Sequence, residues 1–373
     1  MIVENKIVDT FLLITFVTFW LLAFTSKQGR TIFSVPDVFN SKSGSPNKCY
    51  LQESDLKLVE IDLSYAPEFS VIHRKYPSLN PGGSHAPEKC KSFQKLAILI
   101  PYRNRLKHLK ILLYRLHGLL IKQKIDYKIF LIEQADDLNF NRGMLMNVGV
   151  IEALKDDPSY NCFIFHDVDL IPEHDLNIYM CDENLRNFAA SVNENRYHFT
   201  YANYGGGVSG LSKENFFKIN GFPNLYWGWG NEDDDFSART LNFNLKISRP
   251  PLYYARYKMI RHVKSSRIVT ESKFPSFRGR QMIDGVNSIT KESYMVKSIE
   301  PSDPSSRKLR EEEFLFTRIR VNLNQSQQAL PFTSLSILMD EEEEEYKRDE
   351  SSLPWPPQTK QSSWWYLKFY GWL

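Results

Sequence analysis

The sequence contains little cysteine and almost no excess of charge of either sign. Its 373 residues include only 4 cysteines, too few for a disulfide-stabilised scaffold of this length. Lys and Arg total 47 and Asp and Glu total 44, which leaves a formal net charge of +3. That balance argues against a nucleic-acid-binding protein, because such proteins need a strongly basic surface. Hydrophobic residues reach 42%, so the chain as a whole is not disordered.

One apolar run near the N-terminus predicts the compartment. Residues 11–24 carry no charge, and the uncharged stretch extends from Asp9 to Lys27. The run is slightly shorter than the roughly 20 residues of a typical membrane span. We expect a cytoplasmic tail (1–10) and an uncleaved signal anchor (11–25); a cleaved signal peptide is the alternative. In either case the remaining chain enters the secretory pathway, where disulfides can form.

The composition then divides the chain into three further parts. Residues 26–87 are rich in Ser, Pro, Asn and Gly and are predicted to be a stem. Residues 88–324 are predicted to form the folded domain. Residues 325–373 contain an acidic run and a Pro-Trp-Pro-Pro segment, and we expect a disordered tail with docking on a partner or membrane as the alternative.

Apolar spacing in the first half of the domain alternates between strand and helix periodicity. This alternation predicts an α/β fold with a parallel sheet and crossover helices. Ligands bind at the carboxyl ends of the strands in such sheets. The candidates are residues 96–102 (strand), 106–123 (helix), 128–134 (strand), 143–155 (helix) and 161–171 (strand), with a last strand at 314–323.

Two carboxylates follow the third strand candidate. If that strand continues, Asp167 and Asp169 face the same side. Oxygen ligands at this position can hold a divalent cation that bridges a diphosphate. An Asp-x-Asp pattern alone occurs by chance in many loops, so its weight comes from its place after a strand.

The segment 227–235 carries the densest signal in the chain. It reads Trp-Gly-Trp-Gly-Asn followed by four consecutive acids. An acidic run is usually a solvated face, but this one adjoins two tryptophans that can stack on a sugar ring. One carboxylate can then serve as general base for a hydroxyl nucleophile. Gly228 and Gly230 would let the tryptophan segment move.

Further candidates are weak when each is judged alone. Met259 and His262 can point to one metal site, although a core Met beside a surface His is the simpler interpretation. Three arginines near strand ends suit diphosphate recognition, with ordinary surface positions as the alternative. They are Arg103, Arg105 and Arg142. The sequon at Asn324 is consistent with lumenal exposure.

Taken together, seven segments resemble the animal beta-1,4-galactosyltransferase family. The resemblance covers about residues 90–323 and implies a GT-A fold, a Rossmann-like mixed sheet with flanking helices. It also implies an inverting transferase held in the Golgi membrane as a single-pass type II protein with a lumenal catalytic domain. The segments are IPYRNRLKHL, FNRGMLMNVG, FHDVDLIP, GGVSGLSKENFFKINGFPNLYWGWGNEDDDF, SRP, MIRH and DGVNS.

The resemblance assigns roles to individual residues. Asp233 would be the general base with Glu232 beside it, and Mn²⁺ would be held by Asp169, Met259 and His262. UDP-galactose would be bound by Pro101, Tyr102, Arg103, Arg105, Phe140, Arg142, Asp167, Val168 and Trp229. The acceptor would be bound by Tyr201, Tyr204 and Asp234. The family pattern also favours disulfides Cys49–Cys90 and Cys162–Cys181, whereas four cysteines alone allow three pairings.

The expected reaction moves galactose from UDP-galactose to the 4-hydroxyl of a terminal GlcNAc on glycoprotein or glycolipid glycans. Tyr204 favours galactose, because tyrosine at this family position leaves no room for an N-acetyl group on the donor. Gly205 stands where the family usually has Phe. The alternatives are a UDP-GalNAc-dependent transferase, an inactive lectin-like protein and a membrane-anchored scaffold.

Overall fold

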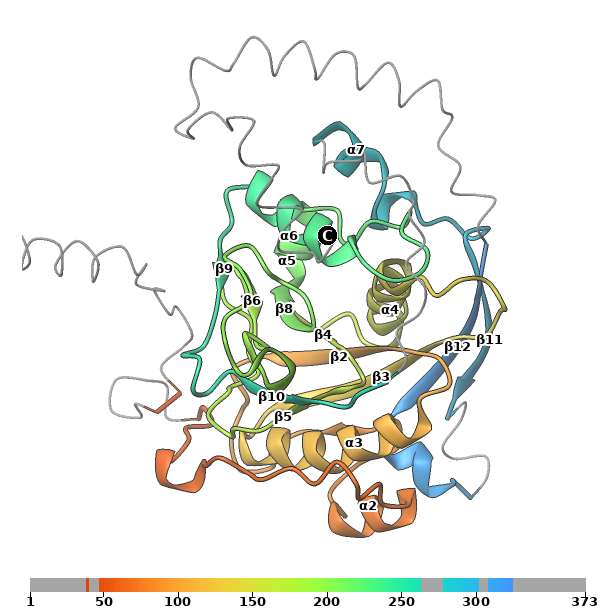
Figure 1. Cartoon of the computed structure of the whole chain (residues 1–373). Helices are drawn as coiled ribbons and strands as arrows, with labels where there is room; N and C mark the ends of the chain where they lie inside the picture. Colours follow the sequence, from red (N-terminus) through yellow and green to blue (C-terminus); the bar gives the residue numbers. More distant parts are fainter. Residues whose placement is uncertain (1–37, 40–46, 263–277, 302–307, 325–373) are drawn as a thin grey trace, which may run out of the picture.

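The computed structural model describes residues 38–39, 47–262, 278–301 and 308–324 (Figure 1). The predicted cytoplasmic tail, signal anchor and C-terminal tail lie outside these residues. Within the described residues, no helix is both long and apolar enough to cross a membrane.

A mixed sheet forms the centre of the described domain. Its strands lie in the order β11-β12-β3-β2-β4-β8-β6-β9, and β1 (Ser84–His85) pairs with β3. Strands β12, β3, β2 and β4 run parallel, whereas β11 and β8 are antiparallel to their neighbours. The bounds are β2 Lys95–Tyr102, β3 Asp126–Gln134, β4 Cys162–His166, β6 Leu185–Asn187, β8 Val208–Ser212, β9 Ile247–Ser248, β11 Tyr294–Glu300 and β12 Thr317–Leu323.

The predicted strand–helix alternation is confirmed in the first half of the domain. Helix α3 (Leu106–Lys122) connects β2 to β3, and helix α4 (Arg142–Asp156) connects β3 to β4. Both helices bury the apolar positions that recur at helical spacing. Crossover helices of this kind are what allow neighbouring strands to run parallel.

The two helices cover opposite faces of the sheet (Figure 1). The face under α3 is packed by Leu112, Leu116 and the inward residues of β2 and β3. The other face is packed by α4 together with aromatic side chains from α5 (Lys213–Lys218) and α6 (Glu232–Asn242), among them Phe216 and Phe236. The core therefore has two apolar layers, with the sheet between them.

The expectation of one continuous strand across residues 161–171 is wrong. Strand β4 ends at His166, and β5 (Leu170–Pro172) leaves the main sheet to pair with β10 (Arg256–Met259). Strand β10 also pairs with β7 (Ser191–Val192) and so completes a small second sheet. The backbone turns between the two strands because the amide of Leu170 donates to the carbonyl of Asp167.

The last strand is present but starts later than predicted. Strand β12 begins at Thr317, and a short 3₁₀ helix, η4 (Glu311–Phe314), precedes it. The remaining short elements are η1 Glu53–Asp55, α2 Phe69–Lys75, η2 Asn193–Asn195, α7 Arg278–Ile283 and η3 Val286–Ser288.

The folded part of the chain extends N-terminally beyond the expected boundary at residue 88. Ile72 and Leu79 are buried in the core under α3, and α2 packs beside that helix. The disulfide Cys49–Cys90 fastens this segment to the chain five residues before the start of β2. Most of the predicted stem that the structure describes is therefore part of the domain.

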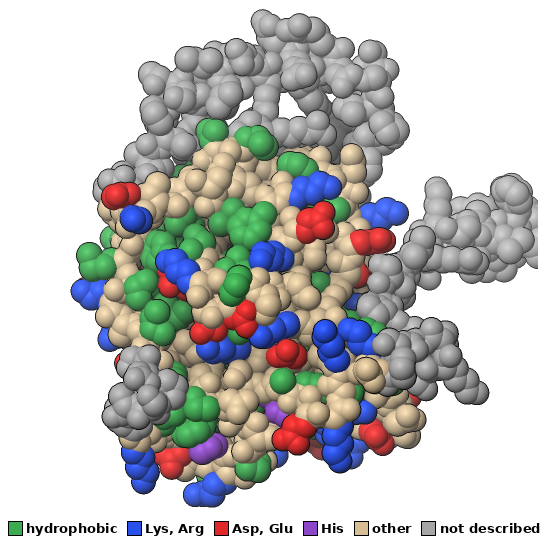
Figure 2. Space-filling view, turned by 180° about the vertical axis from the view of Figure 1, so that it is seen from behind, with side chains coloured by type: hydrophobic (Ala, Val, Ile, Leu, Met, Phe, Trp, Pro, Cys, Tyr) green, Lys and Arg blue, Asp and Glu red, His purple; other side chains and the backbone are tan. Residues whose placement is uncertain are grey.

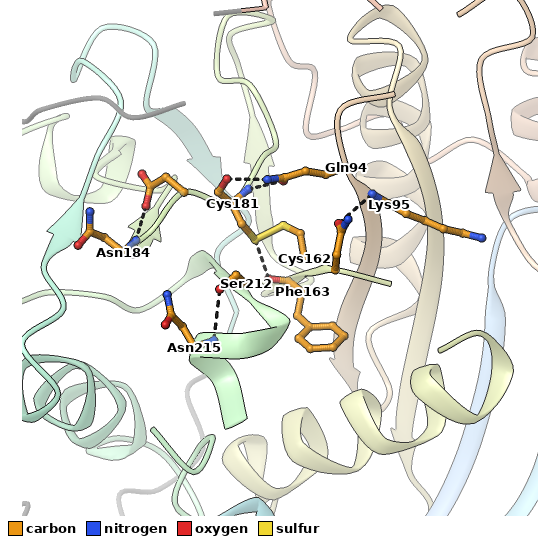
Figure 3. The surroundings of a disulfide bond; sticks show 10 residues. Gln94, Lys95, Cys162, Phe163, Cys181, Asn184, Ser212 and Asn215 are labelled. Carbon is orange, nitrogen blue, oxygen red and sulfur yellow. Dashed lines mark hydrogen bonds between the residues drawn. A yellow bond between two sulfur atoms is a disulfide. The ribbon is translucent and has the colours of Figure 1, made fainter. Parts of the chain in front are cut away.

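The second predicted disulfide is also present. Cys162 at the start of β4 is bonded to Cys181, and the backbone of Cys181 exchanges two hydrogen bonds with the Gln94 side chain, each 2.9 Å (Figure 3). The amide of Lys95 meanwhile donates to the side chain of Asn161. These contacts fasten the start of β4 to the start of β2.

Candidate active site

The two sheets bring together the three predicted metal ligands. Asp169 follows β4, and its carbonyl accepts a hydrogen bond of 2.8 Å from the amide of Ile260. Met259 ends β10 opposite Leu170, and His262 follows three residues later. The Nδ1 atom of His262 lies 3.3 Å from Oδ2 of Asp169. Residues about 90 apart in the sequence therefore meet because β5 pairs with β10.

The surroundings of Asp169 suit a bound cation. The side chain is mostly buried, and burial raises its pKa to about 6. A carboxylate, an imidazole and a thioether form a donor set for a divalent transition metal whose remaining ligands would be diphosphate oxygens. The described residues contain no group of three or more His, Cys, Asp or Glu arranged to hold a metal, as expected for a set with one Asp and one His.

His108 is a neighbour of this cluster that sequence reasoning did not assign. It lies in the first turns of α3, and its ring centroid is 5.8 Å from that of His262. Its Nε2 atom is buried without a hydrogen-bond partner in the described part of the protein. Burial and the nearby charge of Arg105 lower its pKa to about 4, so the imidazole is neutral at pH 7. Helical spacing alone could not find it, because it lies beside the apolar stripe.

Arg142 connects the predicted donor-binding residue to the predicted base. Its Nε donates to Asp167 over 2.7 Å, and its Nη1 donates to Asp233 over 2.6 Å. Burial by itself would lower the pKa of Arg142, but the nearby carboxylates raise it above its ordinary value. The helix start is fixed because the side chain of Asn141 accepts from the amide of Met144. Arg142 thus holds both carboxylates in one cluster.

The acidic run opens helix α6. Asn231 has a left-handed backbone with φ of 75°, which turns the chain into the helix. Glu232 is buried, and burial together with Asp233 raises its pKa to about 8. Burial also raises the pKa of Asp233, against the opposing effect of Arg142. Asp234 accepts a short hydrogen bond from the hydroxyl of Tyr201.

Asp235 shows that the run is not a solvated face. It is buried and accepts a 2.7 Å hydrogen bond from Nε of Arg239 and a 3.0 Å bond from the hydroxyl of Tyr226. Arg280 of α7 also donates to it. Arg239 reaches on to the carbonyl of Asp284. Asp235 therefore fastens α6 to α7, whereas its two neighbours Asp233 and Asp234 face other partners.

The predicted donor-binding residues line the carboxyl ends of β2 and β3. Pro101 and Tyr102 end β2 and are buried, and Val168 packs against the same core. Arg103 donates to the carbonyl of Leu138 over 2.6 Å and lies over the ring of Phe140. Arg105 occupies the N-cap position of α3.

The tryptophan loop, residues 227–230, contacts the same edge of the sheet. The amide of Gly228 donates to the carbonyl of Phe140 over 2.8 Å, and the Trp229 side chain is 50% exposed. Gly228 and Gly230 have φ of 94° and 102°, a region that favours glycine. Trp229 is thus an exposed aromatic ring on a loop segment between two glycines.

Tyr204 borders the predicted base. A Cβ atom added to Gly206 would lie 3.0 Å from Cε2 of Tyr204 and 2.5 Å from Oδ2 of Asp233, so all three crowd together. Burial and the nearby charge of Asp233 raise the pKa of Tyr204, which keeps its hydroxyl neutral. Tyr201 packs edge-on against the Tyr204 ring.

Two surface features complete the comparison with the predictions. Asn324 directly follows β12, and its side-chain amide donates to the carbonyl of Glu292. On the face turned away in Figure 1, acidic and basic side chains are interspersed (Figure 2). That distribution agrees with the small net charge.

The domain is a mixed α/β sheet with a cluster of carboxylates, arginine and histidine at one edge, and it belongs to the glycosyltransferase class. Models of two families match it: the N-terminal region of glycosyl transferase group 7 over residues 49–182, and the N-terminal domain of galactosyltransferase over residues 186–263. The chain is 43% identical to beta-1,4-galactosyltransferase 1 of Mus musculus over 234 residues. It is 41% identical to beta-1,4-galactosyltransferase 4 of Rattus norvegicus over 241 residues. The chain belongs to the beta-1,4-galactosyltransferase family.

The extent of these matches differs between relatives. The aligned region covers 62% of this chain and 58% of the mouse protein, against 64% and 70% for the rat protein. Among solved structures, a Drosophila beta-1,4-galactosyltransferase 7 mutant in complex with manganese, UDP-Gal and xylobiose aligns at 24% identity and a TM-score of 0.49. That alignment covers 62% of this chain and 94% of the other.

Proposed function

We propose that the protein transfers galactose from UDP-galactose to the 4-hydroxyl of a terminal GlcNAc, with inversion at the anomeric carbon and with Mn²⁺ as cofactor. The observation that carries this proposal is the cluster around Arg142. One guanidinium contacts Asp167, expected on the donor side, and Asp233, expected on the acceptor side. Family membership supplies the reaction class, and this geometry supports its assignment to these residues.

Asp233 takes the proton of the acceptor hydroxyl. Its raised pKa makes it a better proton acceptor than an exposed aspartate, and Arg142 fixes the orientation of its carboxylate. The acceptor oxygen attacks the anomeric carbon while the bond to the diphosphate oxygen breaks on the opposite side. Glu232, with a pKa of about 8, is mostly protonated at pH 7 and donates a hydrogen bond instead.

The metal site assists departure of the diphosphate. Asp169, Met259 and His262 would hold Mn²⁺, which neutralises negative charge on the leaving group when it is bound. Arg103 and Arg105 at the end of β2 bind the nucleotide part of the donor. Trp229 closes on the donor from the exposed loop between Gly228 and Gly230.

Tyr204 selects the donor sugar. Its ring lies against Gly206 and Asp233, where the sugar must approach the base. An added N-acetyl group would compete for this space, so galactose is preferred over GalNAc. Family membership also supports the proposal that the active domain lies in the Golgi lumen, behind an N-terminal membrane anchor.

The test is transfer by the full-length chain in detergent. The protein is incubated with Mn²⁺, free GlcNAc and either UDP-galactose or UDP-GalNAc, and products are separated by mass. The expected result is addition of a hexose from UDP-galactose at a much higher rate. A dominant N-acetylhexosamine product would assign the other donor. Binding of UDP without any transfer would instead support a lectin-like protein.

A further inference from the structure

The loop that carries Tyr201 and Tyr204 has little apolar anchoring. Side chains of residues 198–203 are all exposed, including Phe199 and Tyr201. A short exposed segment without buried side chains opens locally at low cost in free energy. Its position must therefore depend on polar contacts with the body of the domain.

Arg249 supplies such contacts from the end of the neighbouring strand β9. Its Nη2 donates to the carbonyl oxygens of Ala202 and Tyr204, each over 2.7 Å. Its guanidinium lies 4.8 Å from the centre of the Phe199 ring. One side chain thus contacts the loop at its beginning and at its end.

Within the described part of the chain, the guanidinium of Arg249 is not engaged in an ion pair. No carboxylate of the described residues lies within 4.0 Å of it, and its Nε atom is buried without a hydrogen-bond partner there. Burial lowers the pKa of Arg249 to about 10. A partly buried cation without a carboxylate is costly, and the two carbonyl oxygens offset that cost. The arginine and the loop therefore depend on each other.

We propose that Arg249 is a positioning residue that holds the 199–204 loop and thereby fixes the Tyr204 ring beside Asp233. The inference rests on the proposed transferase function and adds a determinant of donor choice and acceptor affinity. The contact is direct, because one of the two carbonyl oxygens belongs to Tyr204 itself. Displacing that carbonyl moves the attached ring, which borders Gly206 and the predicted base.

The test uses Arg249→Lys, which keeps the charge but lacks the planar fork that reaches both carbonyls. The matched control is Arg256→Lys. Arg256 is also partly buried and lies 3.9 Å from the Tyr197 ring, but its ion-pair partner is Glu173, away from the loop. For both variants, kcat and KM are measured for the acceptor, and kcat/KM is measured with UDP-galactose and with UDP-GalNAc.

We expect Arg249→Lys to raise the acceptor KM about 10-fold, the scale of one lost charged hydrogen bond. The preference for UDP-galactose over UDP-GalNAc should fall by a similar factor, with a smaller change in kcat. A residue needed only for folding would lower activity with both donors equally. An unchanged donor ratio and an unchanged acceptor KM would overturn the proposal.

A second readout does not require activity. Hydrogen exchange of the peptide covering residues 198–207 is followed without ligands. Arg249→Lys should exchange faster there than wild type, whereas Arg256→Lys should match wild type. If the wild-type protein transfers no sugar, the proposed function fails, and exchange still decides whether Arg249 holds the loop. Equal exchange in all three proteins would refute the loop contact itself.

Discussion

Two aspartates of the same acidic run should respond differently to the same substitution, one with a loss of turnover and the other with a loss of stability. Asp233 and Asp235 are two residues apart at the start of α6, yet one faces Arg142 at the site edge and the other is buried between two arginines. Replacing either with Asn preserves shape and removes one negative charge. The pair therefore separates a catalytic role from a structural one.

For Asp235→Asn, the expected loss is in stability. The neutral side chain leaves the charges of Arg239 and Arg280 without their shared partner in a buried place. Breaking such a buried pair costs about 3–5 kcal/mol. In a domain of this size each kcal/mol corresponds to about 2–4 °C, so the melting temperature should fall by about 6 °C or more.

For Asp233→Asn, the expected loss is in turnover. Arg142 keeps Asp167 as its ion-pair partner, and loss of the Asp233 charge relieves its repulsion with Glu232, so the stability change should stay within about 1 kcal/mol. Without a proton acceptor, kcat should fall about 10²–10⁴-fold, equivalent to roughly 3–5 kcal/mol. UDP affinity should survive, since the nucleotide is proposed to be held by the metal and the arginines and not by Asp233.

The assay compares melting temperature, UDP affinity and kcat at saturating UDP-galactose for both variants. Asp156→Asn is the control, because this residue forms a surface pair with Lys128 and should change none of the three quantities. The reasoning about the base fails if Asp233→Asn turns over within a few-fold of wild type. The reasoning about the contacts of Asp235 with Arg239 and Arg280 fails if Asp235→Asn has the same melting temperature as wild type.

Three further outcomes are expected. A chelator should abolish galactose transfer, and added Mn²⁺ should restore it. The substitution His262→Ala should weaken Mn²⁺ binding, measured by calorimetry, at least about 10-fold. Unchanged Mn²⁺ binding would exclude His262 as a metal ligand. A chain that starts at Ser84 should have a much lower melting temperature than one that starts at Lys48, because the shorter chain lacks the Cys49–Cys90 disulfide and part of the core. Equal melting temperatures would contradict this prediction. The pKa of Glu232 is raised from 4.5 to about 8, so its contribution to stability should fall as pH rises through that range. Glu232→Gln should therefore raise the melting temperature more at pH 9 than at pH 5. A gain in melting temperature that does not depend on pH would refute the assignment of a buried, protonated carboxyl.

Local patterns sufficed to predict the first half of the sheet. The apolar spacing of β2, α3, β3 and α4 is set within each segment, so those elements follow from periodicity. The turn at Asp167 does not follow from periodicity, because it is set by the pairing of β5 with β10, about 90 residues further along the chain. A pairing partner at that distance leaves no mark on the local apolar pattern.

The same distinction applies to the site. The segment 227–235 was recognisable as chemistry-bearing, and the ligand set Asp169, Met259 and His262 came from the family resemblance. Which acid turns inward was not predictable, because Asp235 is selected by Arg280, 45 residues away. Arg249 was equally hidden, since its two acceptors are backbone carbonyls, which every residue carries.

The charges at the site edge agree with the proposed combination of a cation, a base and a buried acid. Three carboxylates, from Asp167, Glu232 and Asp233, surround the single guanidinium of Arg142. Burial favours a smaller net charge, and the raised pKa of Glu232 provides it by retaining one proton at pH 7. Asp169 adds a further carboxylate nearby, with its pKa also raised. A divalent cation at Asp169 would offset this remaining negative charge, and Asp233 would then stay ionised, the form in which it can accept a proton.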